Sequence, residues 1–403
     1  MQPDDKNCYE IILNYNCNAR CLFCSQGSFD RSLNAGFDRI ARNIYTAYKS
    51  GYRRLGFTGG EPLLRPDMLK IVSLGKSVGF KFIRVQTNGI KLADVSFTGA
   101  LVKAGLTFCK FSFLSDSAKE HDRLVGVKGA WQKAMSGLEN LKSLKIRLGN
   151  NIVVNRFNYK RLPEIIHFFL KQGISNFVVI YPLYEGAMAV NAGNLGVSLK
   201  DAGKYLLKSL AFMKKANLHE EILFLNVPPC FLKGSESLAI GLGHYNTVVV
   251  EPLGRKVDLD FDSNRNKVFG KSCMGCDFRG KCGGVNQDYI KFWGWKGFSP
   301  AKKQAISTIK ERTESAGEKE FSGTGKIFFS DNEKCVIEIL ADGKILSTSE
   351  ILKSAKNIPL CRDCADGNAV VNACEKLVQR KMLERIFKRG IYYWKLITAV
   401  DSG

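Results

Sequence analysis

Three cysteines lie close together near the start of the chain, in the run Asn-Tyr-Asn-Cys17-Asn-Ala-Arg-Cys21-Leu-Phe-Cys24-Ser-Gln. Thiolates are ligands for zinc and for iron–sulfur clusters, and a cluster normally takes four of them from the protein. A loop with three thiolates therefore predicts either a distant fourth ligand or a coordination site that is kept open. A zinc knuckle or a disulfide staple is the structural alternative.

Two further groups of cysteines follow later in the chain. Cys273, Cys276 and Cys282 have the spacing Cys-x2-Cys-x5-Cys, and Cys230 is the candidate for a fourth ligand beside them. Zinc and an iron–sulfur cluster both suit this second group, and we favour the cluster. Cys361, Cys364 and Cys374 form the third group, with Cys335 as a candidate partner. This third group predicts a zinc site or a further cluster, or else a thiol-rich corner of a core.

A Gly-Gly-Glu run stands out among the polar segments, in the sequence Thr58-Gly59-Gly60-Glu61-Pro62. Glycine has no Cβ, so backbone polar groups there can approach a ligand closely. A carboxylate directly after the glycines can accept a hydrogen bond from an ammonium group.

The segments that must position these residues alternate between strand and helix. Strand-like runs are 9–13, 54–58, 82–87, 107–114, 148–154 and 177–181, and helical patterns include 38–48, 67–78, 162–171 and 198–216. This βαβ rhythm predicts an α/β fold with a parallel sheet, in the form of a partial (β/α)6 TIM-type barrel. Ligands of such folds gather at the carboxyl ends of the strands. Both the first cysteine loop and the Gly-Gly-Glu run follow a predicted strand.

The Cys-x3-Cys-x2-Cys spacing, the aromatic Phe23 before the third thiol and the Gly-Gly-Glu run together resemble the radical S-adenosylmethionine (SAM) enzymes. The resemblance implies a [4Fe-4S] cluster on Cys17, Cys21 and Cys24, whose fourth iron is chelated by the amino and carboxylate groups of SAM. It also implies cofactor contacts on the barrel. These would come from Phe23, Gly59, Gly60, Glu61, Thr87, Asn88, Ser112 and Tyr181, with Glu61 near the methionyl amine and Tyr181 near the adenine.

Two motifs point to a branch of that family. The Ser115-Asp116 pair and the His121-Asp122 pair are similar to motifs of the branch that matures peptides and the molybdopterin precursor, but Arg123 follows His121-Asp122 directly and makes the match partial. The second cysteine group resembles the SPASM extension of peptide-modifying enzymes. Asn286 occupies the position of that motif's fourth cysteine, which favours a reduced extension with one auxiliary [4Fe-4S] cluster.

The expected domains are a radical SAM barrel over 1–220, an auxiliary-cluster extension over 221–298, a linker over 299–325 and a small cysteine-containing α+β domain over 326–403. In the last domain we expect a strand pair at 327–330 and 335–340 and an amphipathic basic helix at 375–389. That helix could contact nucleic acid or an anionic membrane, although packing onto the barrel is favoured.

The chain has 403 residues, a formal net charge of +22 and 45% apolar residues. It shows neither a secretory signal at the start nor an apolar run long enough for a spanning helix, so we expect a cytoplasmic protein. The charge favours acidic partners.

The resemblance implies reductive cleavage of SAM to a 5′-deoxyadenosyl radical, with an external one-electron reductant. The first hypothesis is modification of an acidic peptide or protein with help from the auxiliary cluster. The alternatives are an RNA-modifying or sulfur-inserting radical SAM enzyme and a zinc-binding interaction protein.

Overall fold

The structure is a computed structural model, and it describes residues 8–242, 245, 247–264, 266–302, 331–341, 343–355, 367–379, 382–388 and 391–397. The chain divides into two compact units, Met1–Thr308 and Ile309–Gly403. Each unit is described by itself below.

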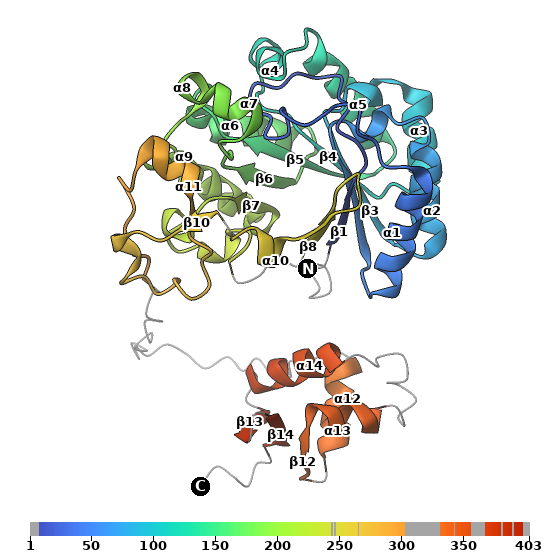
Figure 1. Cartoon of the computed structure of the whole chain (residues 1–403), viewed down its shortest axis with the longest axis vertical. Coiled ribbons are helices and arrows are strands. Elements are labelled where there is room, and N and C mark those ends of the chain that lie inside the picture. The colour runs from blue at the N-terminus through green and yellow to red at the C-terminus, as the bar shows by residue number, and fades with distance from the viewer. Residues whose placement is uncertain are drawn as a thin grey trace, which may run out of the picture. The chain divides into compact units, whose positions relative to one another are not determined.

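A nine-stranded sheet forms the centre of the Met1–Thr308 unit, in the order β7-β6-β5-β4-β3-β2-β1-β8-β9. All neighbouring strands are parallel except β8 and β9, which are antiparallel. The sheet curls, and helices cover its outer face (Figure 1). The strands are β1 Cys8–Ile12, β2 Arg54–Thr58, β3 Phe82–Thr87, β4 Phe108–Phe111, β5 Arg147–Val153, β6 Asn176–Ile180, β7 Ile222–Leu225, β8 Thr247–Val250 and β9 Lys256–Asp258.

The predicted partial barrel is therefore confirmed, and its six predicted strands all form. The sheet also continues beyond them, because β7 pairs with β6 and β8 pairs with β1. Both of these strands come from the segment expected to form only the cysteine-rich extension. A small antiparallel pair, β10 Lys267–Val268 and β11 Val285–Asn286, lies outside the main sheet.

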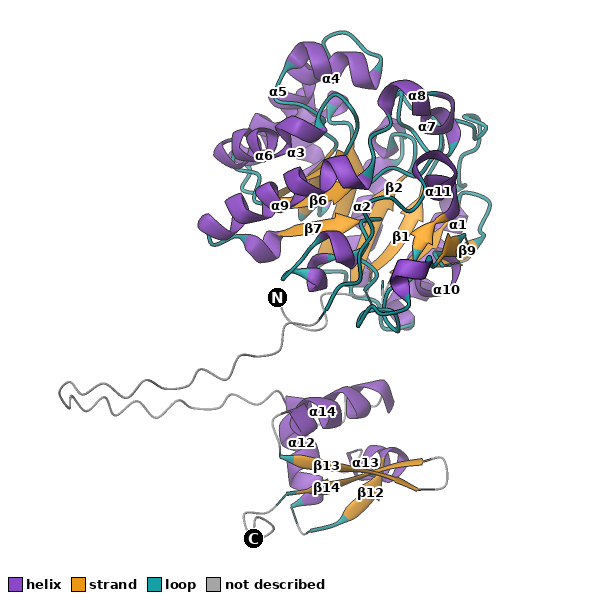
Figure 2. Ribbon diagram, turned by 90° about the vertical axis from the view of Figure 1, so that its left-hand side faces the viewer, coloured by secondary structure: helices purple, strands orange, loops and turns teal. Residues whose placement is uncertain are grey.

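Helices connect successive strands from β1 to β7 (Figure 2). The longer ones are α1 Phe37–Lys49, α2 Met68–Val78, α3 Val95–Ala104, α4 Ala118–Val125, α5 Ala130–Ser143, α6 Leu162–Lys171 and α9 Leu199–Lys215. The shorter ones are α7 Gly186–Val190, α8 Ala192–Leu195, α10 Leu259–Asp262 and α11 Gln287–Trp293. Single 3₁₀ turns are η2 Pro62–Leu64, η3 Ile90–Ala93, η4 Tyr159–Arg161, η5 His219–Glu221, η6 Pro229–Phe231, η7 Glu236–Leu238 and η8 Lys271–Cys273.

Alternate residues of each strand point to opposite faces of the sheet. Ile11, Phe57, Val85 and Phe111 belong to the main hydrophobic core, which they share with residues of the surrounding helices. Their neighbours along the strands, Glu10 and Lys110 among them, face the inside of the curl. The two faces thus differ in polarity, and the inner one is the more polar.

The Ile309–Gly403 unit has an antiparallel sheet in the order β12-β14-β13. Its elements are α12 Asp331–Leu340, β12 Ile345–Ser347, α13 Thr348–Ala355, α14 Gly367–Gln379, β13 Leu383–Lys388 and β14 Ile391–Leu396. Trp394 is fully buried in a separate small core with Leu340, Ile351 and Leu377. This unit is mixed α and β, as the sequence predicts.

Two predicted elements of this unit are wrong. Residues 335–340 belong to helix α12 and not to a strand, because Cys335, Val336, Ile339 and Leu340 are buried at the spacing of one helical face. The helix predicted at 375–389 ends at Gln379, and Leu383–Lys388 forms a hairpin with Ile391–Leu396. Pairing with an aromatic, β-branched partner strand outweighs the helical period there. The predicted strand at 327–330 lies outside the described residues.

Within the described part of the chain, none of the helices combines the length and the apolar character that a membrane span requires.

His121 connects α4 to the end of β4. Its ring is buried, and its Nδ1 accepts a hydrogen bond from the backbone N–H of Leu114 at 3.3 Å. Burial lowers the pKa of His121 to about 4, against an opposing effect of the nearby Asp122. The neutral His121 ring thus joins the start of the loop after β4 to helix α4.

We predict that acid destabilises the folded chain through His121. The unfolded histidine titrates near pH 6.5 and the folded one near 4, so the stability that the neutral ring contributes is present above pH 6.5 and is lost as the pH falls toward 4. The expected loss between pH 7 and pH 5 is about 2 kcal/mol. Urea unfolding at both pH values should show this loss in the wild type and in His219→Asn, which changes an exposed histidine, but not in His121→Asn. Equal pH dependence in all three proteins would contradict the prediction.

Candidate metal and cofactor site

The loop with Cys17, Cys21 and Cys24 begins at the carboxyl end of β1 and is held on two sides. On one side the N–H groups of Arg20 and Leu22 donate to the carbonyl oxygens of Val125 and Leu124, at 2.9 and 3.0 Å. These carbonyls lie at the end of α4. Gly126 follows them with a φ of 69°, and a Cβ there would meet the Arg20 carbonyl oxygen at 2.8 Å. A larger residue would therefore push the loop away.

On the other side the loop contacts α7. The N–H of Ala187 donates to the carbonyl oxygen of Cys24 at 2.9 Å, and a Cβ on Gly186 would meet the Ser25 carbonyl oxygen at 2.5 Å. The Arg31 guanidinium also donates to two carbonyl oxygens of the loop, those of Cys17 at 3.3 Å and Ala19 at 3.2 Å. The three cysteines are thus on a loop whose backbone is fixed by neighbours from α4, α7 and the loop itself.

Gly59 and Gly60 bring the loop after β2 directly against the segment that leads into the cysteines. The N–H of Gly60 donates to the Asn14 carbonyl oxygen at 2.8 Å, and the N–H of Glu61 donates to the Asn16 carbonyl oxygen at 2.7 Å. A Cβ on Gly60 would lie 2.2 Å from that Asn16 oxygen. The absence of a side chain therefore serves first to bring two backbone segments together, a role that the sequence alone did not indicate.

The Glu61 carboxylate is completely buried and accepts three hydrogen bonds from the protein. One oxygen accepts from the Leu63 N–H at 3.0 Å and from the Thr87 hydroxyl at 2.8 Å, and the other accepts from the Asn88 N–H at 2.8 Å. Burial raises the pKa of Glu61 to about 7, although these three donors act in the opposite direction. Glu61 thereby joins the end of β2 to the end of β3.

The other predicted cofactor residues are distributed around the same edge of the sheet. Asn88 Nδ2 lies 3.9 Å from the Cys17 sulfur and donates to Asn18 at 2.7 Å. Phe23 packs partly buried against the main core, and Ser112 is half-buried directly after β4. Tyr181 is buried after β6, where its hydroxyl donates to the Val197 carbonyl oxygen and lies 3.2 Å from the Tyr184 hydroxyl.

The three thiols of the first loop are close enough to influence one another. Burial raises the pKa of Cys21, and the neighbouring Cys17 and Cys24 raise it further. Burial also raises the pKa of Cys17 and Cys24. Such thiols stay protonated unless a metal centre stabilises the thiolate, so the chemistry of the donor set fits an iron–sulfur cluster.

The four thiols of the second group line one pocket. Cys230 comes from η6 and Cys273 from η8, while Cys276 and Cys282 follow in the loop before β11; Phe269 and Phe298 complete the walls. Burial raises the pKa of Cys230 to about 12, and Cys282, Cys276 and Cys273 all add to the effect. The structure therefore brings Cys230, more than forty positions upstream in the chain, to the other three thiols.

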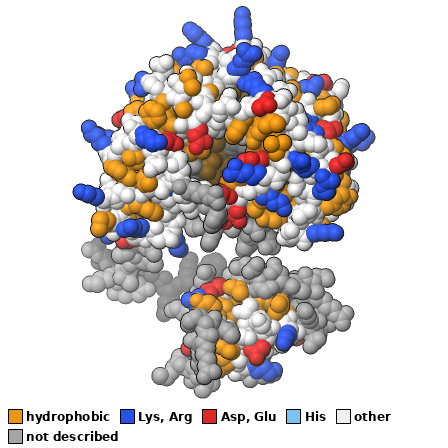
Figure 3. All heavy atoms as spheres, in the orientation of Figure 1, with side chains coloured by type: hydrophobic (Ala, Val, Ile, Leu, Met, Phe, Trp, Pro, Cys, Tyr) orange, Lys and Arg blue, Asp and Glu red, His pale blue; other side chains and the backbone are white. Residues whose placement is uncertain are grey.

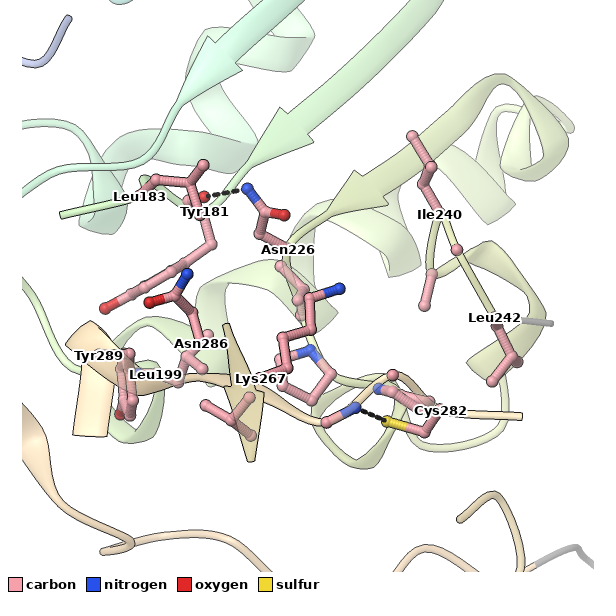
Figure 4. A pocket seen from close by; sticks show the side chains of 18 of the residues that line it. Tyr181, Leu183, Leu199, Asn226, Ile240, Leu242, Lys267, Cys282, Asn286 and Tyr289 are labelled. Atoms are coloured by element: carbon pink, nitrogen blue, oxygen red, sulfur yellow. Dashed lines mark hydrogen bonds between the residues drawn. The ribbon is translucent and has the colours of Figure 1, made fainter. Parts of the chain in front are cut away.

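A second pocket opens beside Cys282, between the ends of β6 and β7 and the β10–β11 pair (Figure 4). Tyr181 and Asn226 line it from the barrel, and the Asn226 side chain donates to the Tyr181 carbonyl oxygen at 3.1 Å. Lys267, Asn286 and Tyr289 line it from the extension. The Cys282 sulfur accepts from the N–H of Gly284 at 3.4 Å. One thiol of the second group thus lies next to a pocket at the carboxyl edge of the sheet.

Among the described residues, no three His, Cys, Asp or Glu side chains are gathered tightly enough to hold a single metal ion. A [4Fe-4S] cluster places each thiolate on a different iron, so its ligands stand farther apart than those of one ion. Cys361 and Cys364 lie outside the described residues. Cys374 is buried in α14 within the small core, together with Cys335. The described residues thus show a core environment for these two cysteines.

The residues that fix the first loop were not found from the sequence. Arg31, Gly126, Gly186 and Asn191 all contact the loop, and the Asn191 side chain donates to the Leu22 carbonyl oxygen at 3.0 Å. The residue type glycine at positions 126 and 186 was the available signal in the sequence; both lie at helix ends, where the structure gives them positive φ.

Comparison with known proteins gives a family for the first part of the chain. Residues 11–169 match the Radical SAM superfamily. A probable GTP 3′,8-cyclase of Sulfolobus acidocaldarius is 30% identical over 212 residues, which cover 52% of this chain and 66% of that protein. A PqqA peptide cyclase of Gluconobacter oxydans is 27% identical over 176 residues, which cover 43% of this chain and 49% of that protein. The aligned segments thus span about half to two thirds of these relatives' own length.

Solved structures show the same fold. The crystal structure of Streptococcus suis SuiB bound to precursor peptide SuiA has a TM-score of 0.55 at 15% identity, over 70% of this chain and 72% of that one. SuiB bound to S-adenosylmethionine has a TM-score of 0.54 at 15% identity, over 70% and 74%. The structures show the fold alone, whereas the family match and the sequence relatives, together with the cysteine loop and the Gly-Gly-Glu contact, assign the chain: it carries a radical SAM domain over residues 11–169 and is a radical SAM enzyme.

Proposed function

We propose that this enzyme modifies a peptide or protein with the help of two iron–sulfur clusters. The observation that carries the proposal is the pair of thiol sites: three cysteines beside the Gly-Gly-Glu contact, and four cysteines around a separate pocket. Three protein ligands leave room for SAM at the first cluster, whereas four ligands complete the second. This division supports an enzyme that binds SAM at one site and uses the other as an auxiliary site.

A [4Fe-4S] cluster bound at the first site would supply the one-electron reduction of SAM, with electrons from an external reductant, and the cleavage of SAM to methionine and a 5′-deoxyadenosyl radical would provide the group that abstracts hydrogen from the substrate. The role of the protein residues is to bind the cofactors and the substrate and to orient them. Cys17, Cys21 and Cys24 would hold the cluster on a loop fixed by α4 and α7. Because the Glu61 carboxylate is already occupied by three protein donors, we assign it a positioning role for Thr87 and Asn88. Leu22 and Phe23 pack against the core and would help to exclude water.

Cys230, Cys273, Cys276 and Cys282 would hold the auxiliary [4Fe-4S] cluster. Phe269 and Phe298 line the same pocket and would shield such a cluster from solvent. Its position beside the pocket of Figure 4 supports a role close to the substrate, either as an electron acceptor or as a binding group. Zinc at the four thiols is the alternative, and iron analysis distinguishes the two.

A peptide substrate is supported by the PqqA peptide cyclase among the relatives and by the net charge of +22, which favours an acidic peptide. The GTP 3′,8-cyclase relatives favour a nucleotide substrate instead. RNA modification and sulfur insertion remain alternatives because of the charge. A cyclised product from GTP, or co-purified RNA that dissociates steeply with salt, would favour a nucleic-acid or nucleotide substrate over a peptide. The proposed location is the cytoplasm.

We predict that Cys17→Ala/Cys21→Ala/Cys24→Ala loses about four irons per chain and all formation of 5′-deoxyadenosine, because it removes the ligands of the SAM-binding cluster. Anaerobic reconstitution, iron analysis and chromatography of the reaction with SAM and dithionite measure both quantities. The control is Cys8→Ala, which changes a cysteine away from both sites. SAM cleavage by the triple variant would refute the proposed function.

We predict that Gly60→Ala lowers SAM cleavage at least about tenfold, because its Cβ would lie 2.2 Å from the Asn16 carbonyl oxygen and displace the segment leading to Cys17. The matched control is Gly36→Ala, since no atom of the described part of the chain lies within 4 Å of a Cβ at Gly36. The rate of 5′-deoxyadenosine formation and the iron content report the effect. Wild-type values for Gly60→Ala would show that the close approach of the two segments does not matter.

We predict that Cys230→Ala does not retain the auxiliary cluster. It should therefore hold about four irons fewer than the wild type after reconstitution and desalting. The reason is that Cys230 is the fourth thiol of that pocket. Cys8→Ala again serves as the control with full iron. An unchanged iron content in Cys230→Ala would show that Cys230 is not a cluster ligand. Zinc in place of iron in the wild type would show that the site does not hold an iron–sulfur cluster.

A further inference from the structure

The inner face of the curled sheet carries a cluster of charged and amide side chains. Glu10 lies on β1, Arg84 and Gln86 on β3, Lys110 on β4 and Asn151 on β5. Each of the five has at least one strand neighbour in the main hydrophobic core on the outer face, and the alternation of side chains along a strand therefore places these five on the inner face. We call these five residues the inner cluster. Figure 3 shows a hollow in the Met1–Thr308 unit inside the curl of the sheet, with basic and acidic side chains near its border.

Four members of the inner cluster are connected to one another. The Arg84 guanidinium lies 3.1 Å from a Glu10 oxygen, and the Gln86 amide also donates to Glu10. The Asn151 amide donates to the Gln86 oxygen at 2.7 Å. Two atoms of this group are buried and have no hydrogen-bond partner among the described residues, the Nε of Arg84 and the Oδ1 of Asn151. Buried polar atoms are normally paired, so each of the two marks an unfilled interaction.

Lys110 is the fifth member, and it is only 6% exposed. Within the described residues its side-chain amine has neither a hydrogen bond nor an ion pair; the Nζ lies 5.6 Å from the centre of the Phe108 ring. A buried ammonium that has no ion-pair partner within reach is costly. Two glycines provide space for the cations. A Cβ on Gly149 would meet Lys110 Cε at 3.1 Å, and a Cβ on Gly56 would meet the Arg84 guanidinium at 3.2 Å.

We propose that the inner cluster is a binding site for one carboxylate of the substrate, with Lys110 as its main counter-charge and Arg84 and Asn151 as supporting groups. The inference rests on the proposed function, because it specifies which peptides the barrel accepts: those with an aspartate or glutamate at or next to the modified position.

The charges and the unfilled atoms favour a carboxylate over a larger anion. Within the inner cluster Glu10 is negative, and Arg84 and the protonated form of Lys110 are positive, so the cluster carries one positive charge more than it can pair internally when Lys110 is protonated. A carboxylate supplies one negative charge and accepts from both Lys110 and the Nε of Arg84. The free Asn151 oxygen can accept from a backbone N–H of the same peptide. A nucleoside triphosphate would bring several negative charges, whereas the excess positive charge of the inner cluster neutralises only one.

The site is also placed where a substrate must react. Gln86 directly precedes Thr87 and Asn88, which contact Glu61 and the sulfur of Cys17. Lys110 is the penultimate residue of β4, directly beneath the carboxyl edge of the sheet. A carboxylate held by the inner cluster would thus anchor a peptide just below the SAM-binding loop.

The test measures binding to the full-length, reconstituted enzyme with SAM present and no reductant. The probes are N-acetyl-glutamate methylamide, its glutamine analogue and GTP, followed by saturation-transfer NMR. We expect the glutamate probe to bind Lys110→Met at least about tenfold more weakly than the wild type, or about 1.4 kcal/mol. The matched control Lys103→Met, an exposed lysine on α3, should bind it like the wild type.

Equal binding of the glutamate probe to Lys110→Met and wild type would overturn the proposal, as would equal binding of the glutamate and glutamine probes. Tighter, Lys110-dependent binding of GTP would assign the site to a nucleotide phosphate instead and also overturn it. The titration needs no turnover. Failure of the wild type to cleave SAM would therefore refute the proposed function without affecting this result.

A second measurement uses the wild type alone and does not depend on a variant that folds. Burial and the nearby Arg84 lower the pKa of Lys110 to about 7; Arg147 and Arg54 act in the same direction and Glu10 in the opposite one. A bound carboxylate favours the protonated amine. The glutamate probe should therefore bind more weakly as the pH rises from 6 to 9, and the glutamine probe should not change. A glutamate affinity independent of pH over this range would contradict the role of Lys110.

Discussion

The structure depends on one close contact between two backbone segments. Residues 59–61 after β2 lie against residues 14–16 after β1, and two hydrogen bonds join them where any side chain on Gly60 would collide. The buried Glu61 carboxylate then connects these segments to the end of β3, because it accepts hydrogen bonds from Thr87 and Asn88. Three neighbouring strand ends are thus tied together at the position where the cysteine loop begins. The geometry of the cysteines follows from that arrangement, since the loop starts from a fixed point and is held again by α4 and α7.

The main features of the barrel could be predicted from the sequence, because its signals are local. Each βα unit has its own apolar strand, its own helical period and a stop such as Gly79, which caps α2 in the left-handed conformation. The motifs were also placed correctly at the carboxyl edge, since parallel strands have that edge in common. β7 and β8 were not predicted as barrel strands. Both are short, and their place in the sheet is set by pairing with β6 and β1 and not by any local pattern.

In the candidate site, too, features set by residues close in the sequence could be predicted more readily than features set by contacts between distant segments. The grouping of Cys17, Cys21 and Cys24 is visible in the sequence, and the structure also brings Cys230 to Cys273, Cys276 and Cys282 as suggested. The hydrogen bonds that the Glu61 carboxylate accepts from Thr87 and Asn88 could not be predicted, because these two donors come from another strand. In the small unit, the period of residues 375–389 favoured a helix, yet Leu383–Lys388 pairs with β14. Pairing with β14 determines the conformation of Leu383–Lys388, and the sequence of that segment alone does not reveal the pairing.

The two outermost strands of the main sheet, β7 and β9, have no strand neighbour on their outer sides in the part of the chain that the structure describes. The curl is therefore an arc and not a closed ring. A closed ring admits only what enters through its mouth, and a polymer would have to thread in by one end. An arc can receive a chain from the side, so a residue far from either end of a long polypeptide could reach the interior while the flanking segments stay outside.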